Sequence, residues 1–299
     1  MRLLVTGTEG QVARSLAELA GPDLEIVRIG RPALDLAAPG DVAALFAAER
    51  PDAIVSAAAY TAVDKAESEP ELAFAINGEG AGAVARAAAT LGVPVIHIST
   101  DYVFDGTTER GLREDDPTGP IGVYGASKLA GEEAVAAATP NHAILRTAWV
   151  YAPFGANFVR TMLRVAKARD ELTVVADQHG TPTAAPDIAA AVVAVARNLV
   201  ARPEDMSLRG IFHMTASGGP TTWADFATEI FRLSAARGGP SAKVTPIPTS
   251  AYPTPAKRPA WSFLDGTKLA TVHGVTLPDW RKGLETVIDR LDAAGEWRE

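Results

Sequence analysis

Tyr124 and Lys128 are the residues of this chain whose types and spacing point most directly to chemistry. They stand four positions apart in a segment that predicts a helix, so both side chains lie on one helix face. An ammonium group beside a phenol lowers the phenol's pKa from its usual value of about 10. A phenol placed in this way can pass a proton to a carbonyl oxygen near neutral pH. The pair therefore predicts general acid catalysis on a carbonyl substrate.

A second polar segment, Ser99-Thr100-Asp101, follows the apolar run Val93–Ile98. In a parallel sheet, ligands bind at the carboxyl ends of the strands, where this segment would lie. Thr100 could then hydrogen-bond the substrate oxygen that Tyr124 protonates. A cap or turn residue is the alternative, and it is the commoner role of such clusters. The order along the chain favours a site: a glycine turn, Thr100 at a strand end, and Tyr124 opening a helix with Lys128.

The glycine turn Gly7–Val12 lies between the apolar run Leu3–Thr6 and the first predicted helix. A dinucleotide-binding turn needs a tight bend, close approach of the backbone to a pyrophosphate, and free N–H groups at the helix start. The residues predicted to hold the pyrophosphate are Gly7, Gly10, Gln11 and Val12. An ordinary strand-to-helix turn is the alternative, and the strand–turn–helix context favours the dinucleotide.

The ends of the second and third predicted strands would border such a cofactor. No acidic residue follows the second strand at Ile29, and Arg31 stands there instead. An arginine suits a 2′-phosphate, which favours NADPH over NADH, although a solvated surface arginine is an almost equal alternative. Asp35 and Leu36 could border the adenine, or Asp35 could cap the next helix. The small side chains of Ala57, Ala58 and Ala59 would let the cofactor lie close across the sheet, or would only pack a helix on it.

Apolar runs alternate with helix-like runs along the first half of the chain. This alternation predicts a parallel sheet covered by helices on both faces. Pro70–Leu91 is predicted to be one long helix. After about Tyr151, prolines, turns and short strands interrupt the helices. We therefore expect residues 1–151 to form mainly a NAD(P)-binding part and residues 152–299 mainly a substrate-binding part, with the chain free to cross between them.

Composition excludes several other classes of function. The chain has 299 residues, no cysteine and a formal net charge of −8. Disulfides, thiolate catalysis and cysteine zinc sites are therefore excluded, and nothing resembles a basic nucleic-acid footprint. No apolar segment is long enough to span a bilayer or to form a signal-peptide core, so we expect a soluble cytoplasmic protein.

Taken together, these segments resemble the extended short-chain dehydrogenase/reductase superfamily and, within it, the dTDP-4-dehydrorhamnose reductases. The resemblance spans nearly the whole chain. The segments that carry it are Gly7–Val12, Ala57–Pro70, Ser99–Phe104, Val123–Glu132, Arg146–Ala152, Asp177–Thr183 and Pro248–Pro259. It implies an α/β fold with a Rossmann-type doubly wound parallel sheet and a smaller C-terminal α/β part that binds the substrate.

The resemblance also implies roles for individual residues. Tyr124 would be the proton donor, Lys128 its partner and a ligand of the nicotinamide ribose, and Thr100 the third member of the triad. The sugar–nucleotide site would be lined by Asp101, Tyr102 and Trp149. Arg258 would contact the diphosphate, because a guanidinium fork suits phosphate oxygens. The implied reaction is hydride transfer from NADPH, with NADH as an alternative donor, to C4 of dTDP-4-dehydro-β-L-rhamnose, the last step towards dTDP-L-rhamnose.

Three other functions stay open at this point. A 4,6-dehydratase or epimerase is disfavoured, because dehydratases of this superfamily place an Asp-Glu pair after the threonine and here Tyr102 follows Asp101. A reductase of another dTDP-4-keto-6-deoxysugar would differ only in a few loop side chains. A non-catalytic relative, the regulatory subunit of methionine adenosyltransferase, shares the fold, but the presence of Thr100, Tyr124 and Lys128 favours an enzyme.

A metal ion, the oligomeric state and a lid are the remaining questions. Some members of the family dimerise around a divalent ion held by carboxylates, but Ser15 and Pro186 stand where acids would be needed. We therefore predict no structural metal and a monomer or a homodimer, with the first helix and Pro186–Ala201 as candidate dimer surfaces. The five histidines are scattered, and His97, within a strand, is predicted to be a core residue. Residues Asp105–Gly119 could form a lid over the sugar.

Overall fold

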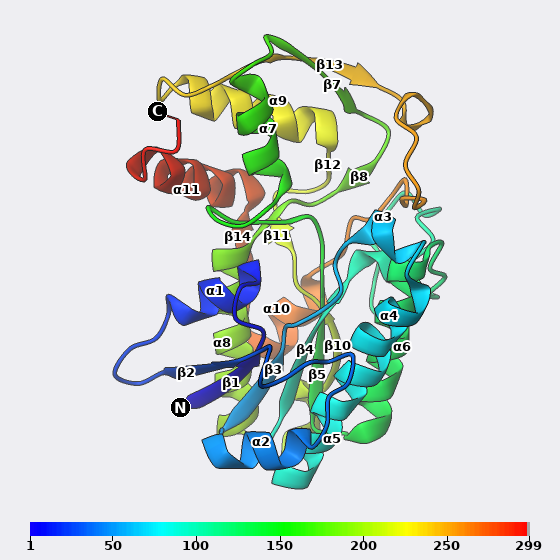
Figure 1. Ribbon diagram of the computed structural model, residues 1–299, viewed down its shortest axis with the longest axis vertical. Coiled ribbons are helices and arrows are strands. Elements are labelled where there is room, and N and C mark those ends of the chain that lie inside the picture. Colours follow the sequence, from blue (N-terminus) through cyan, green and yellow to red (C-terminus); the bar gives the residue numbers. More distant parts are fainter. Residues whose placement is uncertain (298–299) are drawn as a thin grey trace.

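A parallel sheet of six strands lies at the centre of the computed structural model, which describes residues 1–297 (Figure 1). The strands lie in the order β10-β5-β4-β3-β1-β2, and every neighbouring pair is parallel. They are β1 (Arg2–Thr6), β2 (Glu25–Ile29), β3 (Ala53–Ser56), β4 (Val95–Thr100), β5 (His142–Thr147) and β10 (Gly210–His213). The strand order reverses between β1 and β3, which is where doubly wound sheets bind their ligands.

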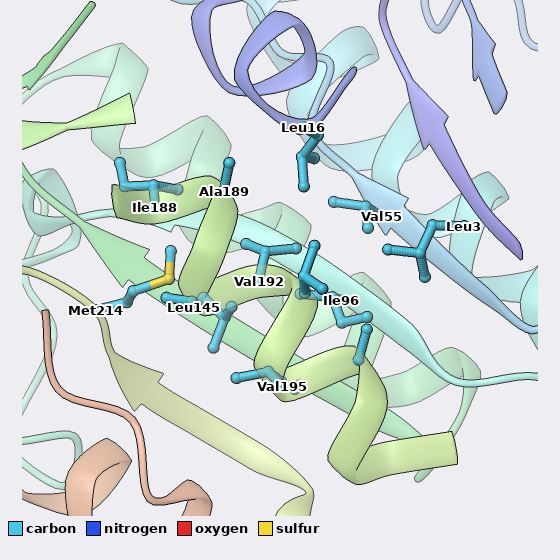
Figure 2. Close-up of a cluster of buried hydrophobic side chains, with 14 of the residues drawn as sticks. Leu3, Leu16, Val55, Ile96, Leu145, Ile188, Ala189, Val192, Val195 and Met214 are labelled. Atoms are coloured by element: carbon cyan, nitrogen blue, oxygen red, sulfur yellow. The ribbon is translucent and has the colours of Figure 1, made fainter. Parts of the chain in front are cut away.

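One face of the sheet is covered by α1 (Gln11–Ala17) and α8 (Ala185–Ala201). Alternate residues of a strand point to opposite faces, so β1 presents Leu3 and Val5 to these helices. Figure 2 shows the apolar side chains of α8 lying beside Leu145 and Ile96 of the sheet.

The opposite face is covered by α2 (Val42–Glu49), α5 (Ala81–Leu91) and α6 (Val123–Ala138). Leu4 of β1 and Ile144 of β5 belong to this second cluster. Fully buried strands with apolar residues on both faces are typical of a parallel sheet between two helical layers. The predicted fold class, a doubly wound α/β sheet with a smaller C-terminal α/β part, is confirmed.

The C-terminal half forms a further apolar core at one end of the sheet (Figure 1). In it α7 (Phe158–Ala166), α9 (Trp223–Ala235) and α11 (Trp280–Ala293) pack with β7 (Glu171–Val175), which pairs with β13 (Lys243–Ile247). Three short pairs connect this core to the sheet: β6 (Val150–Tyr151) with β9 (Thr183–Ala184), β8 (His179–Gly180) with β12 (Thr221–Thr222), and β11 (Ala216–Ser217) with β14 (Leu277–Asp279). The remaining helices are α3 (Val63–Ala66), α4 (Pro70–Phe74) and α10 (Thr267–His273), with 3₁₀ turns at Asp101–Val103, Met206–Leu208 and Thr249–Ala251.

Two elements beyond residue 151 return to the central sheet. Helix α8 covers one of its faces, and β10 adds its edge strand beside β5. The chain thus crosses between the two cores, and the division of labour between residues 1–151 and 152–299 stays a prediction.

The helical stretch predicted over Pro70–Leu91 is confirmed, and a π-helical segment, Ala75–Gly80, lies between α4 and α5 within it. Asn77 in this segment uses its side chain to accept from Tyr60 N and to donate to Tyr60 O and Ser127 Oγ. A wider turn in a helix lets a side chain serve such tertiary partners. Among residues 1–297, no helix is both long and apolar enough to cross a membrane.

Candidate active site

Strand β4 and helix α6 bring Thr100 and Tyr124 together. Thr100 ends β4 and caps the 3₁₀ turn that follows, because its hydroxyl accepts from Tyr102 N at 3.2 Å and donates to Asp101 Oδ1 at 2.9 Å. Tyr124 lies in the first turn of α6, and its phenol is close enough to Thr100 for the threonine to lower its pKa. The ring of Tyr102 meets the Tyr124 ring edge to face, with centroids 5.5 Å apart. The two residues predicted to share a substrate oxygen are therefore neighbours.

Burial, rather than a nearby ammonium group, has the largest effect on the pKa of the Tyr124 phenol. Loss of solvation raises the pKa of Tyr124 to about 12, while the nearby Thr100 hydroxyl lowers the pKa and the charge of Asp101 raises it. The prediction that Lys128 lowers this pKa is wrong for the structure. Tyr124 is half-buried, and a phenol with a pKa raised in this way stays protonated at neutral pH, which is the form that a proton donor requires.

The reason is the direction that Lys128 takes. Its ammonium donates to Ile98 O at 2.7 Å and lies 3.3 Å from His97 Nε2, so it faces β4. Burial lowers the pKa of Lys128 to about 8, and the charge of Glu132 raises it. Lys128 therefore remains mostly protonated at neutral pH while it is almost fully buried.

A buried ion pair anchors α6 to the sheet. Arg146 of β5 donates to Glu132 Oε1 at 2.9 Å and to Glu132 Oε2 at 2.7 Å, and both side chains are at most 3% exposed. Ser99, the neighbour of Thr100, donates to Glu132 Oε1. The pair thus connects the helix of Tyr124 to two strands. Only its place one turn after Lys128 could have suggested a role for Glu132 from the sequence.

The glycine turn has the shape that a pyrophosphate needs. Gly7 has φ +94°, and its missing Cβ would lie 3.4 Å from Ala58 Cβ, so turn and third strand approach closely. Gly10 precedes α1 in extended geometry and supplies no side-chain cap, so no side chain caps the N–H groups of Gln11 and Val12. Uncapped N–H groups at a helix start suit an anion.

The other predicted cofactor residues lie around this turn. Ala57 N and Ala58 N both donate to Thr6 Oγ1, which places the three alanines, Ala57, Ala58 and Ala59, at the end of β3 in half-buried positions. Arg31 is exposed beyond the end of β2. Asp35 accepts from Ala37 N in a turn, whereas the next helix, α2, is capped by Asp41, so the capping alternative for Asp35 is wrong; Leu36 is buried against Gly80.

Trp149 has an unusual backbone for its size. Its φ is +48°, in the left-handed backbone region that residues other than glycine rarely adopt. The indole stacks on Trp223 with centroids 3.6 Å apart and planes 5° apart. Gly180 makes room beneath it, because a Cβ there would come within 2.5 Å of the indole. Trp223, which no motif of the sequence singles out, thus supports a predicted site residue.

Asp101 and Arg258 differ in how their charges are balanced. Asp101 is buried, its Oδ2 has no partner, and burial raises its pKa to about 6, while the nearby Ser262 and the hydrogen bond from Thr100 lower it. Arg258 instead binds both oxygens of Asp64, at 2.9 and 2.8 Å, and also donates to Thr254 Oγ1. A diphosphate contact by Arg258 would therefore compete with Asp64.

Among residues 1–297, no group of three or more histidine, aspartate or glutamate side chains could hold a metal ion. The predicted absence of a metal, the candidate dimer surfaces and the lid at Asp105–Gly119 stay predictions.

The doubly wound sheet, the glycine turn and the Thr100–Tyr124 neighbourhood at the strand ends define a Rossmann-type protein built like the extended short-chain dehydrogenases/reductases. A family model described as "RmlD substrate binding domain" matches residues 1–293. The chain belongs to this family.

Relatives of the chain share its full length. A "dTDP-4-dehydrorhamnose reductase" of Sinorhizobium fredii is 53% identical over 296 residues, which cover 99% of this chain and 99% of the relative. The protein of the same name from Escherichia coli K12 is 42% identical over 297 residues, covering 97% and 98%.

Solved structures agree with these relatives. A dTDP-4-dehydrorhamnose reductase of Clostridium acetobutylicum superimposes with a TM-score of 0.89 at 39% identity, covering 97% of this chain and 99% of that one. The enzyme of the same name from Bacillus anthracis, solved in complex with NADP, gives a TM-score of 0.88 at 35% identity, with the same coverage. A UDP-glucose 4-epimerase from Thermus thermophilus, 24% identical with a TM-score of 0.77, shares the fold.

Proposed function

We propose that this chain is the NADPH-dependent reductase of dTDP-4-dehydro-β-L-rhamnose, and that it reduces the C4 ketone to give dTDP-L-rhamnose. The observation that carries the proposal is full-length similarity to relatives named dTDP-4-dehydrorhamnose reductase, at up to 53% identity over 99% of both chains. The enclosed phenol of Tyr124 beside Thr100 supplies a matching acid. The fold alone would not separate a reductase from an epimerase, because both are built on it.

Residues at the sheet edge fit the cofactor. The N–H groups at Gly10, Gln11 and Val12 would hold the pyrophosphate, with Gly7 and the alanines of β3 giving it room. Arg31 would pair with the 2′-phosphate, and Asp35 and Leu36 would border the adenine. NADPH, when bound, supplies the hydride.

The chain's own residues supply orientation and the proton. Tyr124 holds a proton at its phenol oxygen and passes it to the C4 carbonyl oxygen, because its raised pKa of about 12 keeps it protonated until a stronger base develops. Thr100 orients both oxygens by hydrogen bonds. Lys128, charged at neutral pH, would bind the nicotinamide ribose.

The substrate side would be built from residues in the segments that follow β4, β5 and β13. Trp149 would provide an apolar platform for the sugar nucleotide, with Tyr102 beside the reacting ketone and Asp101 accepting from a sugar hydroxyl. Arg258 would contact the diphosphate when it leaves Asp64. The cofactor and the sugar nucleotide are both multiply charged and do not cross a bilayer unaided, so we place the enzyme in the cytoplasm. We further propose that it is a monomer or a homodimer.

The test compares wild type, Tyr124→Phe and Tyr60→Phe for oxidation of NADPH with freshly made dTDP-4-dehydrorhamnose. Tyr60→Phe is the matched control, because it removes a phenol hydroxyl that is bound to Glu69 instead. We expect Tyr124→Phe to lose about 10²–10⁴-fold in kcat, the usual contribution of general acid catalysis, and the control to stay near wild type. Near wild-type turnover in Tyr124→Phe would remove Tyr124 from the mechanism. If the wild type is folded and binds NADPH but does not oxidise it with this substrate, the result would favour another ketosugar substrate or a regulatory subunit.

A further inference from the structure

His97 lies beneath the active site, between two elements that the reaction needs. Its ring is 1% exposed on β4, with Nδ1 3.1 Å from Ser56 Oγ of β3 and Nε2 3.3 Å from Lys128 Nζ of α6. It is a core residue by burial, as predicted, but its two nitrogens face polar partners. An apolar side chain would serve a purely structural position better, since buried polar groups cost free energy unless they are bonded.

We propose that His97 is a positioning residue for Lys128: a neutral imidazole whose bare Nε2 accepts from the ammonium and fixes its direction and charge. This inference rests on the proposed function in so far as Lys128 serves the reaction.

The contact assigns the tautomer of His97. An ammonium has three donors and no acceptor, so Nε2 can bond to it only as an acceptor. The ring proton must then be on Nδ1, where Ser56 Oγ lies within hydrogen-bond distance to accept it. Ser56 thus acts as the second support of the arrangement.

The His97 ring has to stay neutral for its contact with the Lys128 ammonium to be attractive. Burial holds the pKa of His97 well below its usual range, and the charge of Lys128 and the neighbouring His142 of β5 lower it further. A protonated ring would direct a second donor at the ammonium, in a place where water cannot screen the repulsion.

The groups around Lys128 leave His97 as one of the few acceptors for its ammonium. Glu132, one turn along α6, is the carboxylate that raises the pKa of Lys128, but its oxygens already accept from Arg146 and Ser99. The ammonium itself donates to Ile98 O and faces His97, and these two acceptors of β4 account for two of its three protons.

Loss of the Nε2 acceptor should make the ammonium form less stable. A hydrogen bond to a charged group that is lost in a buried place moves a pKa by about one unit. We therefore expect His97→Phe to lower the pKa of Lys128 by about one unit. The alkaline limb of the kcat/KM profile should move to lower pH by the same amount, and the KM for NADPH should rise. His97→Gln, whose amide oxygen can accept near the place of Nε2, should restore most of the wild-type profile.

The experiment follows the Lys128 Nζ resonance by ¹⁵N NMR as pH is raised, in wild type, His97→Phe, His97→Gln and Ser56→Ala, with kcat/KM measured on the same samples. His273→Gln is the control, because the His273 ring contacts Asn198 and Leu208 O and is not among the groups that shift the pKa of His97 or Lys128. A shift in His97→Phe that His97→Gln reverses supports the proposal. Unchanged titration of Lys128 in a folded His97→Phe overturns it.

A second measurement on the wild type keeps the proposal testable if His97→Phe does not fold. The ¹⁵N shifts of the imidazole must show Nδ1 protonated and Nε2 bare, and a protonated Nε2 would overturn the assignment. Both resonances are read without substrate. Failure of the proposed reaction would therefore appear as absent turnover, while failure of this inference would appear in the titration or the tautomer.

Discussion

The glycine turn Gly7–Val12 and helix α6 both depend on glycine, but they use the missing side chains differently. At Gly10, a Cβ would meet nothing within 4 Å, and the space opens in front of the uncapped start of α1. In α6, a Cβ at Gly125 would collide with Tyr102 O, and a Cβ at Gly131 would collide with Asn77 O. The space beside Gly10 in the turn is open to a ligand, whereas the space beside the glycines of α6 is occupied by backbone atoms of the protein itself.

The same contrast holds for charge. Helix α6 places Lys128 and Glu132 almost out of water, each with hydrogen-bond partners from the sheet. The turn and the strand end beside it leave Arg31 in solvent. We infer that changes in α6 act first on the folded state and through it on catalysis, whereas changes in the turn act on cofactor binding with little effect on folding.

The largest effect on stability is expected from Arg146→Met, which leaves the carboxylate of Glu132 buried without its ion pair. Removing one partner of a buried pair typically costs about 3–5 kcal/mol. The free energy of unfolding by urea should fall by about that amount. The double variant Arg146→Met/Glu132→Leu should recover much of the loss, because no unpaired charge remains.

An exposed pair of similar geometry provides the control. Arg290 donates to both oxygens of Glu18, at 2.9 and 2.7 Å, but the two side chains are 39% and 43% exposed. Glu18→Gln should cost less than about 1 kcal/mol. Equal losses at the buried and the exposed pair would break the comparison.

Gly131→Ala comes next and tests whether α6 is really close-packed. The added methyl group meets the carbonyl of Asn77 in the π-helical segment, which has its own bonds to Tyr60 and Ser127. Overpacking of this kind costs about 1–3 kcal/mol, which should outweigh the gain of about 1 kcal/mol from better helix propensity. A thermal melt of this variant that is at or above wild type would show that the helix can move away without cost.

Asp101→Asn should raise stability, because the carboxyl group is buried beside the site at a cost. With the pKa raised from its ordinary value to about 6, the folded state favours the protonated form. Below about pH 4 the carboxyl is protonated in both the folded and the unfolded chain, and the substitution changes little. As the pH rises from about 4 to about 6, the wild type loses stability relative to the variant, whose amide does not titrate. Above about pH 6 the difference should be constant at about 1–3 kcal/mol.

The measurement is urea unfolding of wild type and Asp101→Asn at pH 4 and pH 8. Both proteins keep an oxygen that can accept from Thr100. A gain in stability that is the same at both pH values would show that packing, and not the buried charge, is responsible.

Gly10→Ala is expected to have the smallest effect on folding and a selective effect on the cofactor. The backbone of Gly10, with φ −64° and ψ 150°, suits any residue, so stability should change by less than about 1 kcal/mol. The methyl group would occupy space that the pyrophosphate needs, and the KM for NADPH should rise about tenfold, which corresponds to about 1.4 kcal/mol. Loss of stability without a change in this KM would reverse the roles assigned to the two regions.

The sequence predicted correctly what depends on near neighbours along the chain. The alternation of apolar runs predicted the parallel sheet, and the placement of Thr100 at a strand end and Tyr124 at a helix start predicted their meeting at one edge. The family was also recognisable from local motifs, and the family model and full-length relatives confirm it. The roles of individual site residues stay predictions.

Burial and distant partners decided two features that the sequence did not predict. Within the helix over Pro70–Leu91, a π-helical segment carries Asn77, whose side chain bonds with Tyr60 and Ser127, and helix propensity cannot foresee such distant partners. The pKa of Tyr124 is raised because enclosure by the fold outweighs the spacing to Lys128.

By itself, the sequence determined the order of the elements, the fold class and the chemistry available at the strand ends, because these follow from hydrophobic period, turn residues and spacing. Only the tertiary structure decided which groups are enclosed together: His97 with Lys128, Glu132 with Arg146, Trp149 on Trp223 and Arg258 on Asp64. The physical reason is that protonation, charge pairing and packing depend on solvent exclusion and on contacts between residues far apart in the chain. No local pattern in the sequence encodes those quantities.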